Sequence, residues 1–137
     1  SWIKEDVSPI EINTATKEDW VKLRGIGEVY AERIIKYRNL LGGFYSADQL
    51  NEVYGIKPEL IMELKQQLTT DRTKTKRLNV NTVSYRDLLR HPYITKKLAY
   101  AITAIREEKR IESFSELEER LPKAVKTDER LAYYFSF

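Results

Sequence analysis

Apolar residues recur along this chain at helical spacing. Between residues 30 and 41 they stand at i, i+4, i+7 and i+11, which places them on one face of an α-helix. A matching face recurs in the second half at Leu98, Ile102 and Ile105. No stretch alternates apolar and polar residues with period two, so the pattern predicts an all-α fold.

Capping residues divide this pattern into short helices. Thr16 and Ser84 are good N-caps, Gly42 and Gly43 favour the end of the first long helix, and Ser46 opens a further short one. The first half is expected to hold helices over 17–23, 30–41, 46–53 and 58–68, and the second half over 85–90, 98–105, 116–121 and 128–135.

The two halves are related in sequence. A shift of 68 residues lays 12–41 over 80–109, and seven of those 30 pairs are identical. The identities fall on capping and core positions: Asn13/Asn81, Thr14/Thr82, Asp19/Asp87, Ile26/Ile94, Ala31/Ala99, Ile34/Ile102 and Arg38/Arg106. We interpret this as a tandem duplication, with domains over 1–70 and 78–137.

The segment 71–77 between these domains carries Arg72, Lys74, Lys76 and Arg77. We interpret it as a solvated basic linker, and a second interpretation is that it follows a phosphate backbone. Arg38 and Arg106 are expected to cap C-terminal helix carbonyls, with contact to DNA as the alternative.

Composition excludes several classes of protein. The 137 residues contain no cysteine, which excludes a disulfide framework and any site built on thiolates, and the single histidine excludes a His-rich metal site. We find no catalytic constellation and no run of 18 apolar residues. We therefore expect a non-enzymatic protein without cofactor, metal or small-molecule substrate. Because the chain starts at Ser1, we also expect a fragment.

Leu23–Gly27, Leu-Arg-Gly-Ile-Gly, is the most informative motif. It lies between a short and a long expected helix, where a tight turn needs positive φ angles that glycine adopts easily. The amides of Gly25, Ile26 and Gly27, with those of the next helix, would then form an anion site. The alternative is a turn that only connects two helices. A second tight turn is expected at Tyr54–Lys57.

Residues 10–68, with motif positions from Ile12 to Ile56, resemble the helix-hairpin-helix pair of ComEA-type competence proteins, and 78–137 resembles it more weakly. The resemblance implies two small helical bundles, similar to SAM domains, that hold double-stranded DNA by its backbone without reading sequence. It also implies a bacterial, extracytoplasmic parent with a membrane anchor. The phosphate contacts expected are Lys22, Arg24, Gly25, Ile26, Gly27, Gly55, Ile56 and Lys57.

The chain departs from that family at both hairpins. Glu28 follows the first hairpin, where its carboxylate would repel a phosphate, whereas Arg24 replaces a common proline. In the second copy Gly25 and Gly27 become Tyr93 and Thr95. We therefore predict that the first copy makes the close phosphate contact and the second adds diffuse charge through Lys96 and Lys97.

The half with the intact glycine hairpin is the more acidic one, whereas a DNA-binding surface is expected to be basic. Residues 1–70 hold 9 Lys and Arg against 11 Asp and Glu, whereas 71–137 hold 15 against 10. The alternative function is therefore a protein-interaction module that keeps the fold and has lost DNA binding. His91 is expected as a turn residue at the surface. The aromatic residues expected to seal the units, or to form a partner patch, are Trp2, Tyr133, Tyr134, Phe135 and Phe137.

Overall fold

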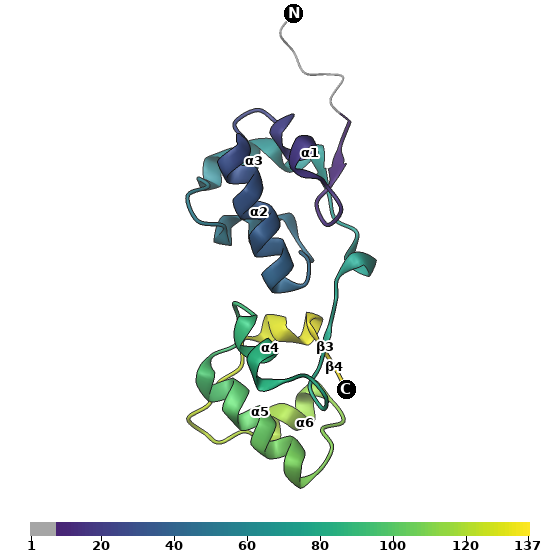
Figure 1. Ribbon diagram of the computed structural model, residues 1–137, viewed down its shortest axis with the longest axis vertical. Coiled ribbons are helices and arrows are strands. Elements are labelled where there is room, and N and C mark those ends of the chain that lie inside the picture. The colour runs from purple at the N-terminus through teal and green to yellow at the C-terminus, as the bar shows by residue number, and fades with distance from the viewer. Residues whose placement is uncertain (1–7) are drawn as a thin grey trace, which may run out of the picture. The chain divides into compact units, whose positions relative to one another are not determined.

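A computed structural model describes residues 8–137 and divides the chain into two compact units (Figure 1). The first unit ends at Thr75, and the second runs from Lys76 to Phe137. Trp2 lies outside the described residues.

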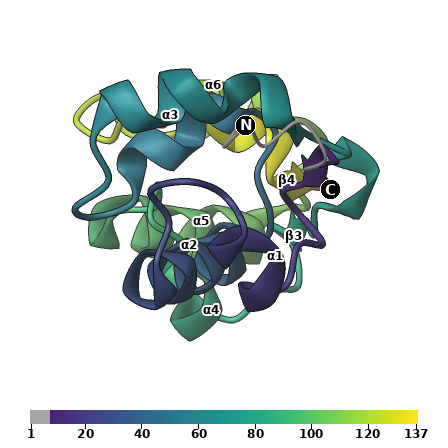
Figure 2. The same cartoon turned by 90° about the horizontal axis from the view of Figure 1, so that it is seen from above.

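The first unit is built around one long helix, α2, with α1 packed beside it (Figures 1 and 2). Its elements are β1 (Ile10–Glu11), α1 (Lys17–Val21), α2 (Glu28–Leu41), the 3₁₀ helix η1 (Ala47–Glu52), α3 (Pro58–Leu64), η2 (Lys65–Gln67), β2 (Leu68–Thr69) and η3 (Arg72–Lys74).

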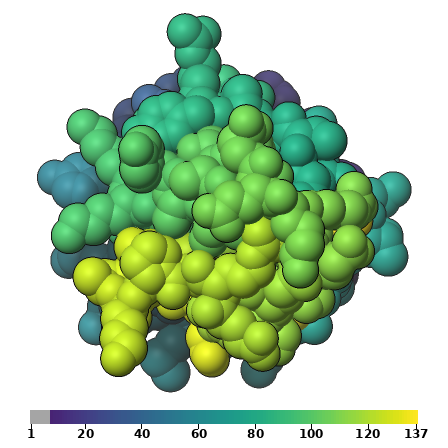
Figure 3. All heavy atoms as spheres, turned by 90° about the horizontal axis from the view of Figure 1, so that it is seen from below, coloured from purple at the N-terminus to yellow at the C-terminus, as the bar shows by residue number. Residues whose placement is uncertain are grey.

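The second unit repeats this order in a reduced form. Its elements are β3 (Leu78–Asn79), α4 (Tyr85–Arg90), α5 (Lys96–Glu108), α6 (Phe114–Arg120), the 3₁₀ helix η4 (Glu129–Tyr133) and β4 (Phe135–Ser136). In Figure 3, which shows the molecule from below, the yellow C-terminal segment lies against the green atoms of the helical part.

The chain is mostly helical, which confirms the all-α prediction, and it adds two short strand pairs that the sequence did not predict. Each unit contains a pair of two-residue parallel strands, β1 with β2 and β3 with β4. A strand of two residues is too short to produce an alternating pattern, so the sequence gives no sign of it. The predicted helix over 58–68 also divides into α3, η2 and β2.

The expected linker over 71–77 is part of the first unit as far as Thr75. The amide of Asp71 donates to Glu11 Oε2 at 2.8 Å, and its carbonyl accepts from Asn13 Nδ2 at 3.0 Å. Arg72 Nε donates to the carbonyl of Tyr45 at 2.7 Å. These hydrogen bonds hold a segment whose composition alone is typical of a solvated connection.

Each unit has its own apolar core, which contains the helical faces expected from the sequence. In the first unit Trp20, Ile34 and Phe44 are fully buried, and Ile26 secures the α1–α2 turn. The buried core side chains of the second unit include Leu88, Ile102, Ile111, Leu117, Leu131, Tyr134 and Phe135.

Arg38 and Arg106 do not cap the helices that carry them, and that prediction is wrong. Arg38 Nη1 donates to the carbonyls of Ile12 and Ala15 at 2.9 and 2.8 Å. Arg106 Nη1 donates to the carbonyls of Val80 and Val83, which lie 68 positions after Ile12 and Ala15. Each arginine therefore ties the last turn of its long helix to the loop that precedes the short helix.

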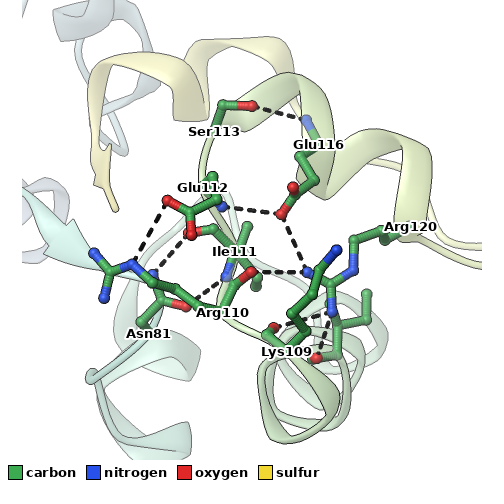
Figure 4. A network of polar contacts seen from close by, with 9 residues as sticks. Asn81, Lys109, Arg110, Ile111, Glu112, Ser113, Glu116 and Arg120 are labelled. Carbon is green, nitrogen blue, oxygen red and sulfur yellow. Dashed lines mark hydrogen bonds and ion pairs between the residues drawn. The ribbon is translucent and has the colours of Figure 1, made fainter.

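An asparagine pair repeats in the same way. Asn13 exchanges two hydrogen bonds with the backbone of Phe44, at 2.7 and 2.6 Å. Asn81 makes the same two bonds with Ile111, both at 2.8 Å (Figure 4). The amide side chain replaces a missing backbone partner at one place in each unit.

The two long helices end differently. Gly42 closes α2 with a φ of 91°, the left-handed conformation expected of it. α5 has no glycine there, and the side chain of Arg120 binds its last carbonyls instead (Figure 4). The guanidinium donates to the carbonyls of Ile105, Lys109 and Arg110 at 2.8, 3.0 and 3.2 Å.

Candidate nucleic-acid interface

The α1–α2 turn has the backbone that its glycine predicts. Gly25 has a φ of 91°, and a Cβ built there would lie 2.6 Å from Leu60 Cδ1 on α3. Ile26 is buried, and its amide donates to the carbonyl of Leu23 at 3.1 Å. Gly27 differs from expectation, because its φ is −93° and a Cβ there would meet nothing within 4 Å. Only Gly25 is required by the turn itself.

The N–H groups of this turn are open to a ligand. Among the described residues, the amides of Gly25 and Gly27 have no hydrogen-bond acceptor. Gly27 is the N-cap of α2 and has no side chain with which to cap it, so the first-turn amides stay available. A hollow of about 650 Å³, lined by residues 21–27, lies over this turn.

The second hairpin of the first unit, between η1 and α3, has the same construction. Gly55 has a φ of 88°, Ile56 is buried, and Lys57 is an exposed N-cap of α3 without a side-chain capping bond. A Cβ on Gly55 would lie 2.5 Å from Arg33 Nη1 and 3.5 Å from Tyr30 Cε1, both on α2.

The two hairpins are therefore packed reciprocally. Gly25 of the first lies against α3, which follows the second, and Gly55 of the second lies against α2, which follows the first. This arrangement brings together two turns that are separated by 30 positions in the sequence.

The cations predicted to contact phosphate are exposed. Lys22, Arg24 and Lys57 lie at or beside the two turns and have exposed side chains. Lys22 has Asp19 at 3.9 Å, a distance typical of a weak surface pair. In the described part of the chain Arg24 and Lys57 have no carboxylate within ion-pair distance.

Glu28 is neutralised by a residue that sequence reasoning did not single out. Lys17 Nζ lies 2.8 Å from Glu28 Oε1 and 3.0 Å from Glu32 Oε2. The hydrogen bond and positive charge of Lys17 lower the pKa of Glu28, and both carboxylates raise the pKa of Lys17. The carboxylate predicted to repel a phosphate thus has a cation beside it. The 11-residue separation of Lys17 and Glu28 gave no indication of this contact.

The equivalent hairpin of the second unit is closed by side chains. Thr95 Oγ1 accepts the amide of Leu98 at 3.1 Å, so α5 has the side-chain cap that α2 lacks. The ring of Tyr93 packs against Tyr134, with centroids 5.9 Å apart, and the Arg130 guanidinium carbon lies 3.9 Å from the Tyr93 centroid.

His91 belongs to this closed hairpin and is buried, so its predicted surface position is wrong. Its Nδ1 accepts the amide of Tyr93 at 3.1 Å, and its ring lies 4.8 Å from that of Tyr134. The equivalent residue of the first unit, Leu23, is apolar and is buried as well. Its apolar character was the signal in the sequence that position 91 is buried.

The predicted auxiliary cations fall into two groups. Arg72 lies over the ring of Tyr45, and Arg77 donates to the carbonyls of Ala132 and Phe135, so both are used inside their own units. All six of these residues are exposed, and for Lys74, Lys76, Lys96 and Lys97 no such contact lies within the described residues. The described residues contain no cluster of metal-ligating side chains and no helix long and apolar enough to cross a membrane.

Two helices joined by a glycine turn, with buried isoleucine and outward amides, define a helix-hairpin-helix motif. Residues 6–69 match the family model described as "Helix-hairpin-helix motif". This motif generally indicates nucleic-acid binding.

Relatives of known sequence match parts of the chain. Endonuclease/exonuclease/phosphatase family domain-containing protein 1 of Danio rerio is 33% identical over 72 residues, 53% of this chain and 13% of the relative. The Mus musculus protein of that name is 26% identical over 128 residues, 72% of this chain and 22% of the relative. An uncharacterized Haemophilus influenzae protein is 50% identical over 48 residues, 34% of this chain and 43% of the relative.

The chain thus spans less than half the length of each of these relatives. No solved structure matches it.

Proposed function

We propose that the chain is a tandem helix-hairpin-helix module that binds double-stranded DNA through its phosphates, without sequence preference and without catalysing a reaction. The observation that carries this proposal is the open α1–α2 turn, where the amides of Gly25 and Gly27 lie uncapped at the start of a 14-residue helix. Uncapped amides at a helix N-terminus favour a phosphate oxygen, because their dipoles point toward it.

The reciprocal packing of the hairpins supports a two-point contact with one duplex. Hydrogen bonds from backbone amides to phosphates position a protein on DNA and carry no sequence information. Arg24 and Lys57 add exposed charge beside these amides. Under this proposal the second unit, whose equivalent helix N-terminus is capped by Thr95, contributes charge through Lys96 and Lys97 and makes no close amide contact.

The test is a titration of a labelled duplex with the 137-residue protein at salt concentrations from about 50 to 200 mM. We expect binding that weakens steeply with salt and is equal for unrelated sequences, because released counterions dominate the free energy of such contacts. Absence of binding at about 50 mM salt, or retention that does not depend on salt, would contradict the proposal.

A matched pair of variants locates the contact. Gly27→Asp places a capping carboxylate over the open amides of α2 at a position whose φ of −93° accepts any residue. We expect a loss of affinity of tenfold or more with the fold retained. Thr95→Asp adds the same charge at the equivalent position of α5, which Thr95 already caps, and we expect it to weaken binding less than threefold. The reverse order of effects would assign the contact to the second unit.

A second candidate function is a protein-interaction module, and the closed hairpin of the second unit favours it. That unit also has a groove of about 370 Å³ on α5, lined in part by Tyr100, Ala104, Ile105 and Val125. If a protein partner is the ligand, pull-down or light scattering should detect association that persists at high salt. DNA-phosphate binding would disappear under the same conditions.

A further inference from the structure

Tyr54 is an exposed aromatic residue at the tip of the second hairpin of the first unit. It is 81% exposed, the highest value among the large apolar side chains of the described residues. It directly precedes Gly55 and takes the position that Arg24 has before Gly25. One hairpin therefore presents a cation before its glycine, and the other presents an aromatic ring.

Arg33 holds this tyrosine from below. Its Nη1 donates to the carbonyl of Tyr54 at 3.2 Å, and its guanidinium carbon lies 5.0 Å from the centre of the Tyr54 ring. A guanidinium at that distance attracts the ring through its π-electrons. The side chain is thus exposed to solvent yet restrained in position, which lowers the entropic cost of placing a ligand on its free face.

The arrangement is particular to the first unit. The residue of α5 that corresponds to Arg33, 68 positions later, is Ala101, which can neither bind a carbonyl nor support a ring. Among the described residues, the other tyrosine exposed by more than 70% is Tyr100, on α5 in the groove of the second unit. It provides a matched control of similar exposure.

We propose that Tyr54, positioned by Arg33, stacks on an unpaired base and makes the first unit prefer duplexes with a bulge or gap over intact ones. This inference rests on the proposed backbone binding, because the hairpin must first hold a phosphate beside the ring. In an intact duplex the faces of the bases are covered by their neighbours and the ring finds no free face. An unpaired base exposes that face, and stacking on an aromatic side chain then adds affinity.

The experiment compares two duplexes with the same base pairs, one intact and one that carries a single extra, unpaired 2-aminopurine as a bulge. For the 137-residue protein we expect about tenfold tighter binding to the bulged duplex, within the range that one base–aromatic stack provides. The fluorescence of 2-aminopurine should fall on binding, because stacking on the tyrosine ring quenches it. Tyr54→Ala should bring the ratio of the two affinities close to one and abolish the quenching.

Three further variants separate the ring from other effects. Tyr54→Phe keeps the ring and should keep both preference and quenching. Tyr100→Ala removes a similarly exposed ring from the second unit and should change neither. Arg33→Ala leaves the ring unsupported, and the preference should fall to an intermediate value while circular dichroism stays unchanged.

The outcomes are distinguishable from failure of the proposed function. If the protein binds the intact duplex in a salt-dependent way but shows no preference for the bulge, the role of Tyr54 is overturned and backbone binding stands. Equal losses on both duplexes for Tyr54→Ala, without a change in quenching, would also overturn it. If neither duplex is bound, both proposals fall.

Discussion

Two glycines of one turn differ in what the fold requires of them. Gly25 has a left-handed φ of 91° and has Leu60 behind it, whereas Gly27 has a φ of −93° and open space around its Cα. The turn therefore requires glycine at position 25 for its backbone conformation, whereas at position 27 the absence of a side chain matters only for the proposed phosphate contact. Loss of DNA binding in a Gly25 variant would report damage to the turn as much as loss of a contact.

We predict opposite effects of alanine at these positions on stability. Gly25→Ala should lower the free energy of unfolding by about 1 kcal/mol or more, because alanine is strained at positive φ and its Cβ meets Leu60. Gly27→Ala should raise the free energy of unfolding by about 0.4–1 kcal/mol through the reduced entropy of the unfolded chain. Urea denaturation of the two variants measures both. Equal destabilisation would show that Gly27 is also conformationally required.

At the scale of elements, the equivalent helices α2 and α5 begin and end with different residues and different hydrogen bonds. A glycine turn leaves α2 uncapped, and Thr95 caps α5. Gly42 ends α2, and the Arg120 side chain ends α5. Side chains in the second unit replace what backbone conformation does in the first, which preserves the helix and covers its terminal polar groups.

The start of α1 provides a test of pH dependence. Asp19 accepts the amide of Thr16 at 2.9 Å in a capping box, and hydrogen bonds from Thr16 lower the pKa of that carboxyl below its ordinary value. A lowered folded-state pKa means that this stabilisation is present above the unfolded-state pKa of about 3.9 and is lost as the pH falls through the folded-state pKa.

We therefore predict that Asp19→Asn lowers the free energy of unfolding at pH 7 and that the difference from the parent protein shrinks toward pH 3. Urea denaturation at pH 7, 5 and 3 measures this difference. The control is Asp87→Asn in α4, because the Asp87 carboxylate accepts no hydrogen bond within residues 8–137. A difference for Asp19→Asn that is independent of pH would contradict the assignment.

At the scale of the whole molecule, charge and open hairpins lie on different units. Residues 1–75 contain 11 Lys and Arg against 12 Asp and Glu, and 76–137 contain 13 against 9. Backbone amides provide an anion site without net positive charge, so the open hairpin does not need a basic unit around it. The basic second unit would add long-range attraction, which salt screens.

This division predicts the behaviour of the separated units. We expect 1–75 to retain salt-dependent binding to duplex DNA with reduced affinity, and 76–137 to bind more weakly than 1–75 at about 150 mM salt. Fluorescence anisotropy of a labelled duplex measures both, with circular dichroism to show that each fragment is folded. Stronger binding by 76–137 would show that the charged side chains of the second unit, and not the backbone amides of the first, make the principal contact with DNA.

The sequence by itself determined the helices, their caps and the first hairpin, because these depend on neighbours within four residues. Thr16 and Ser84 cap as predicted, Ser46 and Gln49 form a capping box, and Gly42 ends its helix. The 68-residue repeat also placed Arg38 and Arg106 correctly as equivalents.

Only the tertiary structure decided which carbonyls Arg38 and Arg106 bind and which backbone amides of the hairpins have no hydrogen-bond acceptor. The targets of Arg38 lie 23 and 26 residues away, and the strand pair β1–β2 joins positions 58 apart. The pairing of Glu28 with Lys17, the support of Tyr54 by Arg33 and the burial of His91 likewise depend on chain segments that only folding brings together. Local spacing carries no information about such contacts, because they are set by how the helices pack.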